Sequence, residues 1–196
     1  MANHNFSDLH NFDGLQFIPV NEFKQPIVKD WQTTIKKHDL SKCYGVGLVC
    51  GTPSGNVESL DFDCKYDLTG TLFEDYKNAV NTQMPTLLKK MVVQKTKNNG
   101  YHFIYRCAEI QGNLKLANRH TTDIEKQQTY DLTYKNEVTK SSEEQAIKVA
   151  KKASENDKVR VLIESRGAGG QIVISPTAGY EIIFGDLYSI TEISKE

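Results

Sequence analysis

The stretch that decides the fold is LVCGTPSGNVESLDFDCK, residues 48–65. The apolar segments YGVGLVCG (44–51) and VESLDFD (57–63) predict strands, and the turn TPSGN between them permits a hairpin with its acids at the far end. On a strand, Asp61 and Asp63 point to the same face about 6.6 Å apart along the backbone, while Phe62 points the opposite way, into packing. Two short carboxylates placed in this way can converge on one hard cation.

The segments on either side predict a mixed α/β chain. LQFIPV (15–20) predicts a strand, and the segment after it predicts a helix from about Asp30. LTGTLFEDYKNAVN (68–81) predicts an amphipathic helix that begins near Thr69 and ends before Pro85. The remaining predicted strands lie in MVVQKT (91–96) and YHFIYRC (101–107), which flank an Asn-Gly turn, in RVLIESRG (160–167), and on both sides of the Pro-Thr-Ala-Gly turn in GAGGQIVISPTAGYEIIFG (167–185).

The stretch from Ala108 to Asp157 is polar and rich in Lys, Glu, Thr, Asn and Gln. It contains one predicted helix, SSEEQAIKVAKKASEN (141–156), with Ser141 as the N-cap and Glu144 three residues later. A chain of 196 residues with 38% hydrophobic content can bury a proper core. We therefore expect a single domain over residues 1–196, with a polar, partly helical insertion at about 108–157.

Composition excludes several classes of protein. No run of about 18 apolar residues occurs, and the N-terminus MANHNFSDLH lacks a basic and then apolar signal pattern, so we expect a cytoplasmic protein with no membrane partner. The four cysteines form no C-x-x-C pair and have no histidines at zinc spacing. We expect reduced, mostly buried thiols and no structural zinc.

Charge is segregated along the chain although the net charge is only −1. Residues 56–75 contain six acids and one lysine, whereas residues 76–108 contain six basic residues and no acid. An acidic focus beside a basic one suits a cation together with a polyphosphate; the alternative is two ordinary solvated faces. The basic residues are Lys77, Lys89, Lys90, Lys95, Lys97 and Arg106.

Glu164 is the best candidate for a third acid beside Asp61 and Asp63. It lies in the apolar segment RVLIESRG, where an unpaired carboxylate would be costly to bury, and it shares strand parity with Arg166. A metal site with shared carboxylates needs such a residue. The alternative is a weak surface pair between Glu164 and Arg166.

His102 follows directly after a glycine turn inside the basic stretch, and Lys97 lies across the same turn. The backbone N–H groups of Asn99 and Gly100, together with the side chains of Lys97 and His102, would form a phosphate-binding corner. A histidine between two aromatic residues in a strand is also a common structural residue, so both interpretations stand.

Four segments in order resemble one known family: FKQPIVKDW, GLVCGTPSGNVESLDFD, KTKNNGYHFIYR and LIESRGAGGQIVISPTAGYEIIFGD. The chain resembles the primase-polymerase branch of the archaeo-eukaryotic primase superfamily, enzymes of phages, plasmids and mobile elements. The resemblance extends from Phe17 to Ile193. It implies an α/β (α+β) fold in which an RRM-like catalytic sheet packs against a second small α/β unit.

The resemblance also implies roles for individual residues. The family's three motifs coincide with Asp61-Phe62-Asp63, His102 and Glu164, although many members have aspartate at the third motif and serine with two glycines where this chain has Asn98-Asn99-Gly100. The early Lys/Pro/Trp signature, Lys24, Pro26 and Trp31, implies a structural role. The implied metal ligands are Asp61, Asp63 and Glu164, and the implied nucleotide-binding residues are His102, Lys97, Gly100 and Arg166.

The function implied by the resemblance is template-dependent nucleotidyl transfer by a DNA primase/polymerase. The implied cofactors are two Mg²⁺ or Mn²⁺ ions, which suit an all-oxygen ligand set. The implied partners are NTP or dNTP, a single-stranded DNA template and a primer. Family members often carry a helicase, so a replicative helicase is a further expected partner.

Two other functions stay open at the level of sequence. A metal-dependent glycosyltransferase also uses Asp-x-Asp after a strand, but that function does not account for His102 together with Glu164. A non-catalytic module that binds single-stranded nucleic acid on an RRM-like sheet would leave the acids merely solvated. Metal-dependent binding of dNTP, compared with UDP-sugar, discriminates among the three.

Overall fold

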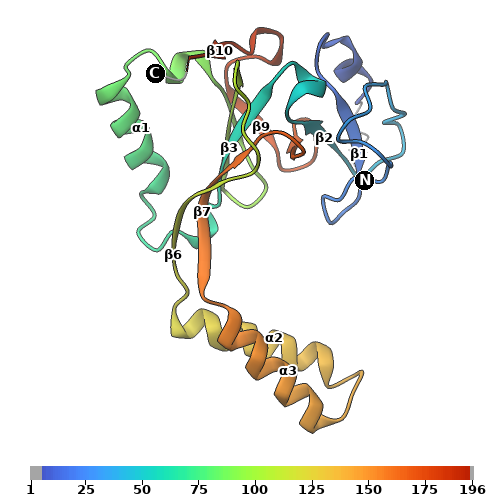
Figure 1. Ribbon diagram of the computed structural model, residues 1–196, viewed down its shortest axis with the longest axis vertical. Coiled ribbons are helices and arrows are strands. Elements are labelled where there is room, and N and C mark those ends of the chain that lie inside the picture. Colours follow the sequence, from blue (N-terminus) through green and yellow to red (C-terminus); the bar gives the residue numbers. More distant parts are fainter. Residues whose placement is uncertain (1–5, 195–196) are drawn as a thin grey trace. The chain divides into compact units, whose positions relative to one another are not determined.

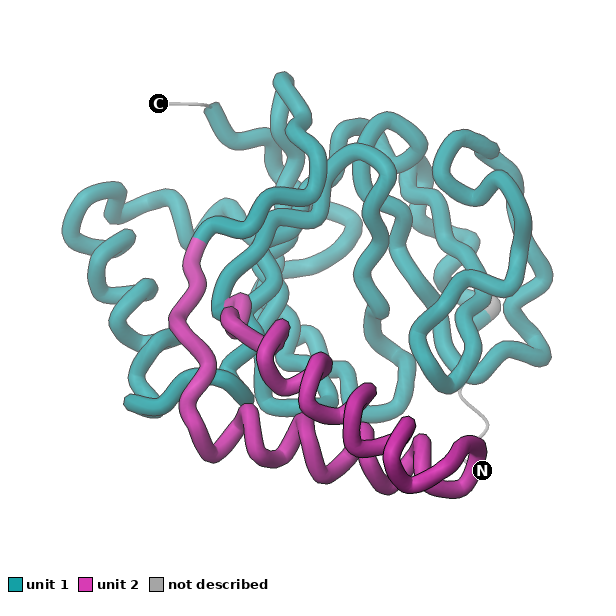
Figure 2. The backbone as a smooth tube through the Cα atoms, turned by 60° about the horizontal axis from the view of Figure 1, so that its bottom comes forward, with its two compact units in different colours: residues 1–116, 162–196 teal, residues 117–161 magenta. Residues whose placement is uncertain are grey.

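The computed structural model describes residues 6–194, and the backbone divides into two compact units (Figure 2). The first unit comprises the described parts of residues 1–116 and 162–196, and the second comprises residues 117–161. The architecture is mixed α/β, as predicted, with antiparallel pairing dominant. Two strands, β6 (Lys115–His120) and β7 (Val159–Arg166), each run from one unit into the other.

A three-stranded antiparallel sheet carries the N-terminal part of the first unit. Its order is β1-β2-β8, with Phe17 opposite Leu48 and Val46 opposite Ile174. The strands predicted from apolar segments in these parts of the sequence are confirmed. The bounds are β1 Phe17–Val20, β2 Gly45–Val49 and β8 Gln171–Ile174.

The second sheet has seven strands in the described part of the chain. Its order is β6-β7-β3-β5-β4-β9, and the short β10 pairs with β5 in parallel. The hairpin predicted from MVVQKT and YHFIYRC is confirmed as β4 and β5. The bounds not yet given are β3 Val57–Phe62, β4 Val92–Lys95, β5 Tyr101–Cys107, β9 Glu181–Phe184 and β10 Glu192–Ile193.

The two faces of this sheet separate by strand parity. On one face, Phe62 and Phe103 pack beneath helix α1 (Leu72–Gln83), where they contact Phe73 and Tyr76. Phe62 is fully buried, which confirms that it points into packing. The helix predicted from near Thr69 is likewise confirmed, with Thr71 as its N-cap.

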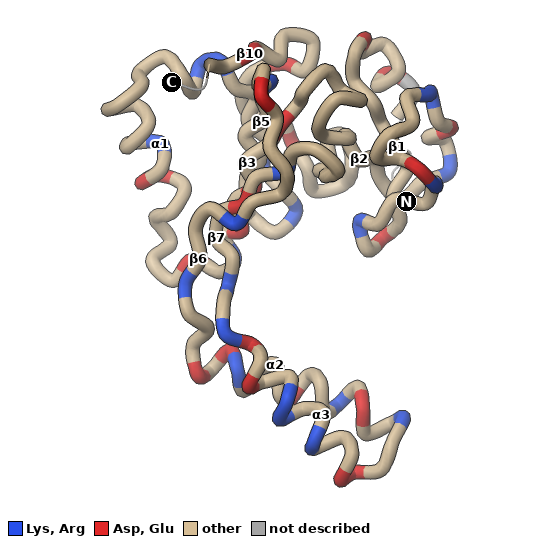
Figure 3. Tube along the Cα trace, viewed as in Figure 1, with Lys and Arg blue, Asp and Glu red and all other residues tan. Residues whose placement is uncertain are grey.

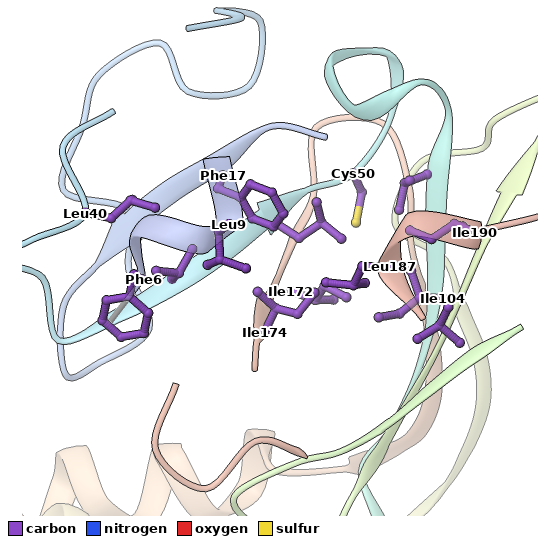
Figure 4. Packing of buried hydrophobic residues seen from close by; sticks show 14 residues of the cluster. Phe6, Leu9, Phe17, Leu40, Cys50, Ile104, Ile172, Ile174, Leu187 and Ile190 are labelled. Carbon is purple, nitrogen blue, oxygen red and sulfur yellow. The ribbon is translucent and has the colours of Figure 1, made fainter. Parts of the chain in front are cut away.

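The opposite face packs partly against the three-stranded sheet (Figure 4). Phe17, Leu48 and Ile172 from the small sheet share one core with Val92 and Ile104 from the large sheet. Each such side chain stabilises the fold by about 1.5–3 kcal/mol when fully buried. The shared core fixes how the two sheets of the first unit meet, and residues of the large sheet beyond its border carry the candidate site.

The hairpin predicted between the strands at 44–51 and 57–63 is wrong. Strand β2 pairs with β1 and β8, whereas β3 lies in the other sheet; Gly51 and Val57 form only an isolated bridge. Between them, η2 (Thr52–Ser54) and three residues with positive φ, Gly51 at 90°, Gly55 at 64° and Asn56 at 60°, redirect the chain. The turn chemistry was recognised correctly, but the turn takes the chain from one sheet into the other.

The helix predicted from about Asp30 is also wrong, because this segment forms only turns. Asp30 has a φ of 52°, and its carbonyl oxygen accepts hydrogen bonds from the N–H groups of Thr33 (3.2 Å) and Thr34 (3.0 Å). Three successive β-branched residues, Thr33, Thr34 and Ile35, disfavour continuation of that turn into a helix. The segment after β1 therefore forms no α-helix.

The second unit is a helical hairpin formed by α2 (Asp123–Glu137) and α3 (Glu143–Asn156) (Figure 1). Only the second helix was predicted, and its N-cap is Ser142 rather than Ser141. Helix α2 begins with a full capping box between Thr122 and Glu125, a Thr-x-x-Glu signal that is visible in the sequence. Basic and acidic residues are interspersed along both helices (Figure 3).

The expectations about the cysteines and about membrane-spanning segments can be compared with the structure. All four cysteines are free; Cys50 is buried and the other three are half-buried, so fewer are buried than expected. Burial raises the pKa of the Cys50 thiol to about 12. In the described residues, no helix combines the length and apolar character needed to cross a bilayer.

Candidate active site

A row of polar side chains crosses the large sheet on the face opposite α1. Asp61 on β3 lies directly between Glu164 on β7 and His102 on β5, and His102 in turn lies opposite Gln94 on β4. Directly paired residues project from the same face, with Cβ atoms about 4.5–5.5 Å apart. The structure thus brings together the first, second and third predicted motifs in one row, with Asp61 at its centre.

Asp61 is held as a carboxylate by its neighbours. Its Oδ1 lies 3.5 Å from His102 Nε2, and its Oδ2 lies 3.7 Å from Arg166 Nε. Burial acts to raise the pKa of Asp61, but the hydrogen bond from His102 and the charges of Arg166 and Lys24 outweigh it and lower the pKa. Asp61 is therefore ionised and can act as an oxygen ligand.

Glu164 responds in the opposite direction. Burial raises the pKa of this carboxyl, and the negative charges of Asp61 and Asp63 reinforce the effect, although Arg166 acts against it. Arg166 also donates a hydrogen bond to Glu164 Oε1. Arg166 is thus the ion-pair partner of two carboxylates on neighbouring strands. The row therefore carries more negative than positive charge, and an added cation would reduce the repulsion between its acids.

Asp63 lies just beyond the end of β3, and its carboxylate lies 3.5 Å from Lys65 Nζ. Among the described residues, no three acidic, histidine or cysteine side chains stand close enough together to hold a metal ion. Asp61 and Glu164 fit a hard divalent ion by donor type and by their direct pairing across strands. Asp63 is paired with Lys65 instead and does not complete a group of three ligands in the described residues.

His102 is buried, with a relative exposure of 5%, between Asp61 and Gln94 in this row. Its Nδ1 lies 2.9 Å from the side-chain nitrogen of Gln94, and its Nε2 faces Asp61. The imidazole ring is therefore held at Nδ1 by Gln94, and its Nε2 is directed toward the acids. This geometry suits a donor that contacts a charged ligand beside Asp61.

The turn before His102 differs from the expected phosphate corner. The N–H of Asn99 donates to the Thr96 carbonyl (3.1 Å) and the N–H of Gly100 donates to Thr96 Oγ1 (3.1 Å), so both donors are used within the turn. A Cβ on Gly100 would lie 2.2 Å from the Phe62 carbonyl oxygen. Glycine is thus required for close backbone approach, and a phosphate grip at this corner would have to come from side chains.

Lys97 extends from the same turn over the ring of Tyr44, whose hydroxyl lies 3.4 Å from Lys97 Nζ. With Tyr180, Lys97 lines a hollow of about 390 Å³. Tyr180 is buried, and its ring centroid lies 6.2 Å from that of His102. Tyr180 therefore lies between the hollow and His102, and the residues that line the hollow do not include Asp61, His102 or Glu164.

Sequence reasoning missed Gln94 and Tyr180 and gave Lys24 only a structural role. Lys24 Nζ lies 5.8 Å above the Tyr180 ring, and its charge contributes to the lowered pKa of Asp61. Lys24 lies on a turn that follows β1, held by Asn21, whose side-chain oxygen accepts from the N–H groups of Phe23 and Gln25. No local pattern connects this turn with β3, so only the fold reveals the proximity.

The assembled site can therefore hold a divalent cation on its acids and an anion on its surrounding cations. Comparison with known families is consistent with this chemistry. A sequence model described as "Bifunctional DNA primase/polymerase, N-terminal" matches residues 9–193. None of the curated proteins searched matches the chain.

Proposed function

Because the chain belongs to the bifunctional DNA primase/polymerase N-terminal family, we propose that it is a template-dependent nucleotidyltransferase that extends a 3′ hydroxyl with NTP or dNTP. The observation that carries the proposal is the row in which Asp61 lies between Glu164 and His102. In this proposal, Asp61 and Glu164 are ligands for a cation, and His102 beside them is a donor to a phosphate. The proposed partners are a nucleotide, a primer and a single-stranded DNA template.

In the proposed reaction, the 3′ oxygen forms a bond to the α-phosphorus of the nucleotide. The bond from that phosphorus to the bridging oxygen of the β-phosphate breaks, pyrophosphate leaves, and the hydroxyl proton passes to solvent. Asp61, Glu164 and Asp63 would hold Mg²⁺ or Mn²⁺. When bound, these ions supply charge neutralisation for the phosphates and a lowered pKa for the attacking hydroxyl.

The side chains around the row have separate roles in binding. His102 donates from Nε2 to the triphosphate, while Arg166 orients the two carboxylates and offers its remaining N–H groups to a phosphate. Lys24 and Lys97 add positive charge around Tyr180, where the triphosphate tail would lie. Their contribution is electrostatic and should weaken as salt concentration rises.

A non-catalytic DNA-binding module is less well supported than an enzyme. That function requires the acids to be merely solvated, whereas the side chains of Asp61 and Glu164 are only 19% and 17% exposed. Two partly buried carboxylates on directly paired residues repel each other, which costs stability. Such costly arrangements cluster at functional sites, where a ligand offsets the repulsion. The acids are therefore better explained as ligands than as surface charges.

Primer extension with Asp61→Asn tests the proposal. With Mn²⁺, a primed single-stranded template and dNTPs, we expect the wild type to extend the primer and the variant to lose at least about a hundredfold in rate. Glu74→Gln is the control, because Glu74 is an exposed acid on α1, paired only with Lys77 on the other side of the sheet. Undiminished extension by Asp61→Asn would overturn the proposal.

A further inference from the structure

We infer that Gln94 is a positioning residue that fixes the tautomer of His102, so that the proton resides on Nε2 and faces the acids. No sequence motif pointed to this glutamine. The tautomer follows from hydrogen bonds alone, whereas its consequence for nucleotide binding rests on the function proposed above.

Gln94 is completely buried, with a relative exposure of 0%, where the two sheets of the first unit meet. Its side-chain oxygen accepts from the backbone N–H of Ser175 (2.6 Å), and its side-chain nitrogen donates to the carbonyl oxygen of Val173 (3.0 Å). The same nitrogen lies 2.9 Å from His102 Nδ1. Both N–H donors of the amide and one acceptor position of its oxygen are thus occupied by protein partners.

These contacts determine the orientation of the amide. If it were turned over, its NH₂ group would face the N–H of Ser175 and its oxygen would face the carbonyl of Val173, which opposes two like groups at hydrogen-bonding distance. An unpaired buried polar group costs about 1–3 kcal/mol, so two such contacts exclude the reversed orientation. The oxygen therefore faces Ser175, and the nitrogen faces both Val173 and His102.

The orientation of Gln94 in turn determines the state of His102. One N–H of the amide is used by Val173, and the second points at Nδ1, which must accept it. A neutral imidazole that accepts at Nδ1 carries its proton on Nε2. Since Nε2 lies 3.5 Å from Asp61 Oδ1, the ring presents a donor toward the site where a phosphate would bind.

The backbone groups that orient Gln94 lie at the end of β8, in the three-stranded sheet. The glutamine itself belongs to the seven-stranded sheet. The donor direction of His102 is therefore set by the junction of the two sheets. A change at this junction would alter nucleotide affinity without touching an acid or a cation of the site.

The experiment is long-range ¹H–¹⁵N correlation NMR of imidazole nitrogens in the full chain, with His102 assigned by its loss in His102→Gln. We expect a protonated nitrogen at ε2 and an unprotonated nitrogen at δ1. In Gln94→Met we expect protonated Nδ1 to become populated, and the apparent KM for dNTP to rise by about three- to tenfold with a smaller change in kcat.

Gln16→Met is the matched control. Gln16 is also a buried glutamine, but its amide bonds only to the backbone of Phe17 and Lys36. This variant should lose comparable buried hydrogen bonds while leaving the His102 tautomer and the KM as in the wild type. The comparison separates a loss of stability from a change at the histidine.

A proton on Nδ1 in the wild type would overturn the inference even if neither variant folds. An unchanged tautomer in folded Gln94→Met would also overturn it, since the amide would then not select the proton position. The NMR result decides the tautomer whether or not the chain extends primers. Failure of the proposed polymerase function is therefore distinguishable from failure of this inference.

Discussion

In the part of the chain that the structure describes, arginines contact pairs of carboxylates in two clusters, and the two clusters are built differently. In the first unit, Arg166 is the one arginine that contacts both Asp61 and Glu164 in the described residues, and the pKa values of the two acids move in opposite directions. This cluster has a surplus of acid. A partly buried excess of carboxylates does not stabilise the fold by itself. It is, however, the arrangement expected where a cation binds.

The helical hairpin contains the balanced counterpart. Glu125 pairs with Arg119 (2.6 Å) and Arg160 (3.5 Å), and Asp157 pairs with Arg160. Hydrogen bonds from Arg119 and from the Thr122 N–H lower the pKa of Glu125 to about 2, and the hydrogen bond from Arg160 lowers that of Asp157. Because two acids face two guanidinium groups, we expect this cluster to have a structural role and the acid-surplus cluster to have a binding role.

The largest effect should come from the acid-surplus cluster. Glu164→Gln keeps the shape of the side chain but removes its charge, so we expect primer extension to fall at least about a hundredfold while the melting temperature stays within a few degrees. Glu164→Asp, which restores the charge, should recover most of the rate. Equal activity in the glutamine and aspartate variants would contradict a ligand role.

The balanced cluster should respond in stability instead. Glu125→Gln removes a bidentate partner of Arg119 and weakens the capping box of α2, so the hairpin should lose about 2–3 kcal/mol. Hydrogen exchange over residues 117–161 measures this loss. Exchange as slow as in the wild type would show that charge balance does not stabilise the hairpin.

A smaller effect is expected from the cation beyond the acid-surplus cluster. Lys24→Met should raise the apparent KM for dNTP about threefold, because Lys24 contributes charge beside Tyr180 without pairing to an acid. Steady-state kinetics at low and at high salt checks this, and the difference between variant and wild type should shrink at high salt. Lys36→Met is the control lysine, since the Lys36 backbone, not its ammonium group, bonds to Gln16.

The balanced cluster also predicts an acid response of the hairpin. Glu125 has a pKa of about 2 when folded, against 4.5 as its ordinary value, so it contributes stability above pH 4.5 that is lost as the pH falls toward about 2. The helical circular dichroism signal and the protection from hydrogen exchange over residues 117–161 should weaken in that window. Glu125→Gln should remove this part of the acid dependence, and an unaltered profile would contradict the pairing.

Much of the fold could be predicted from local patterns. Alternation predicted the β4–β5 hairpin and the burial of Phe62, because parity along a strand needs no knowledge of its neighbours. The exchange of sheets between β2 and β3 could not be predicted, since the same turn residues serve a hairpin or a crossing. Helix α2 could have been found from its Thr-x-x-Glu box, which its polar composition obscured.

The candidate site could be predicted to the same extent. Asp61, His102 and Glu164 were recognisable because each motif is local, and the fold adds that they lie opposite one another on three neighbouring strands. Gln94 and Lys24 were not recognisable as site residues, because their relation to the row depends on how the two sheets meet. The role of a buried polar residue such as Gln94 depends on hydrogen-bond partners that are distant in sequence.

The most direct test of the account is the binding of Mn²⁺, followed by electron paramagnetic resonance, to the wild type, Asp61→Asn, Glu164→Gln and Glu125→Gln. The account predicts saturable binding by the wild type and Glu125→Gln, and at least about tenfold weaker binding when either acid of the surplus cluster is neutralised. Equal affinity in all four proteins would contradict the claim that the acid surplus is the cation site.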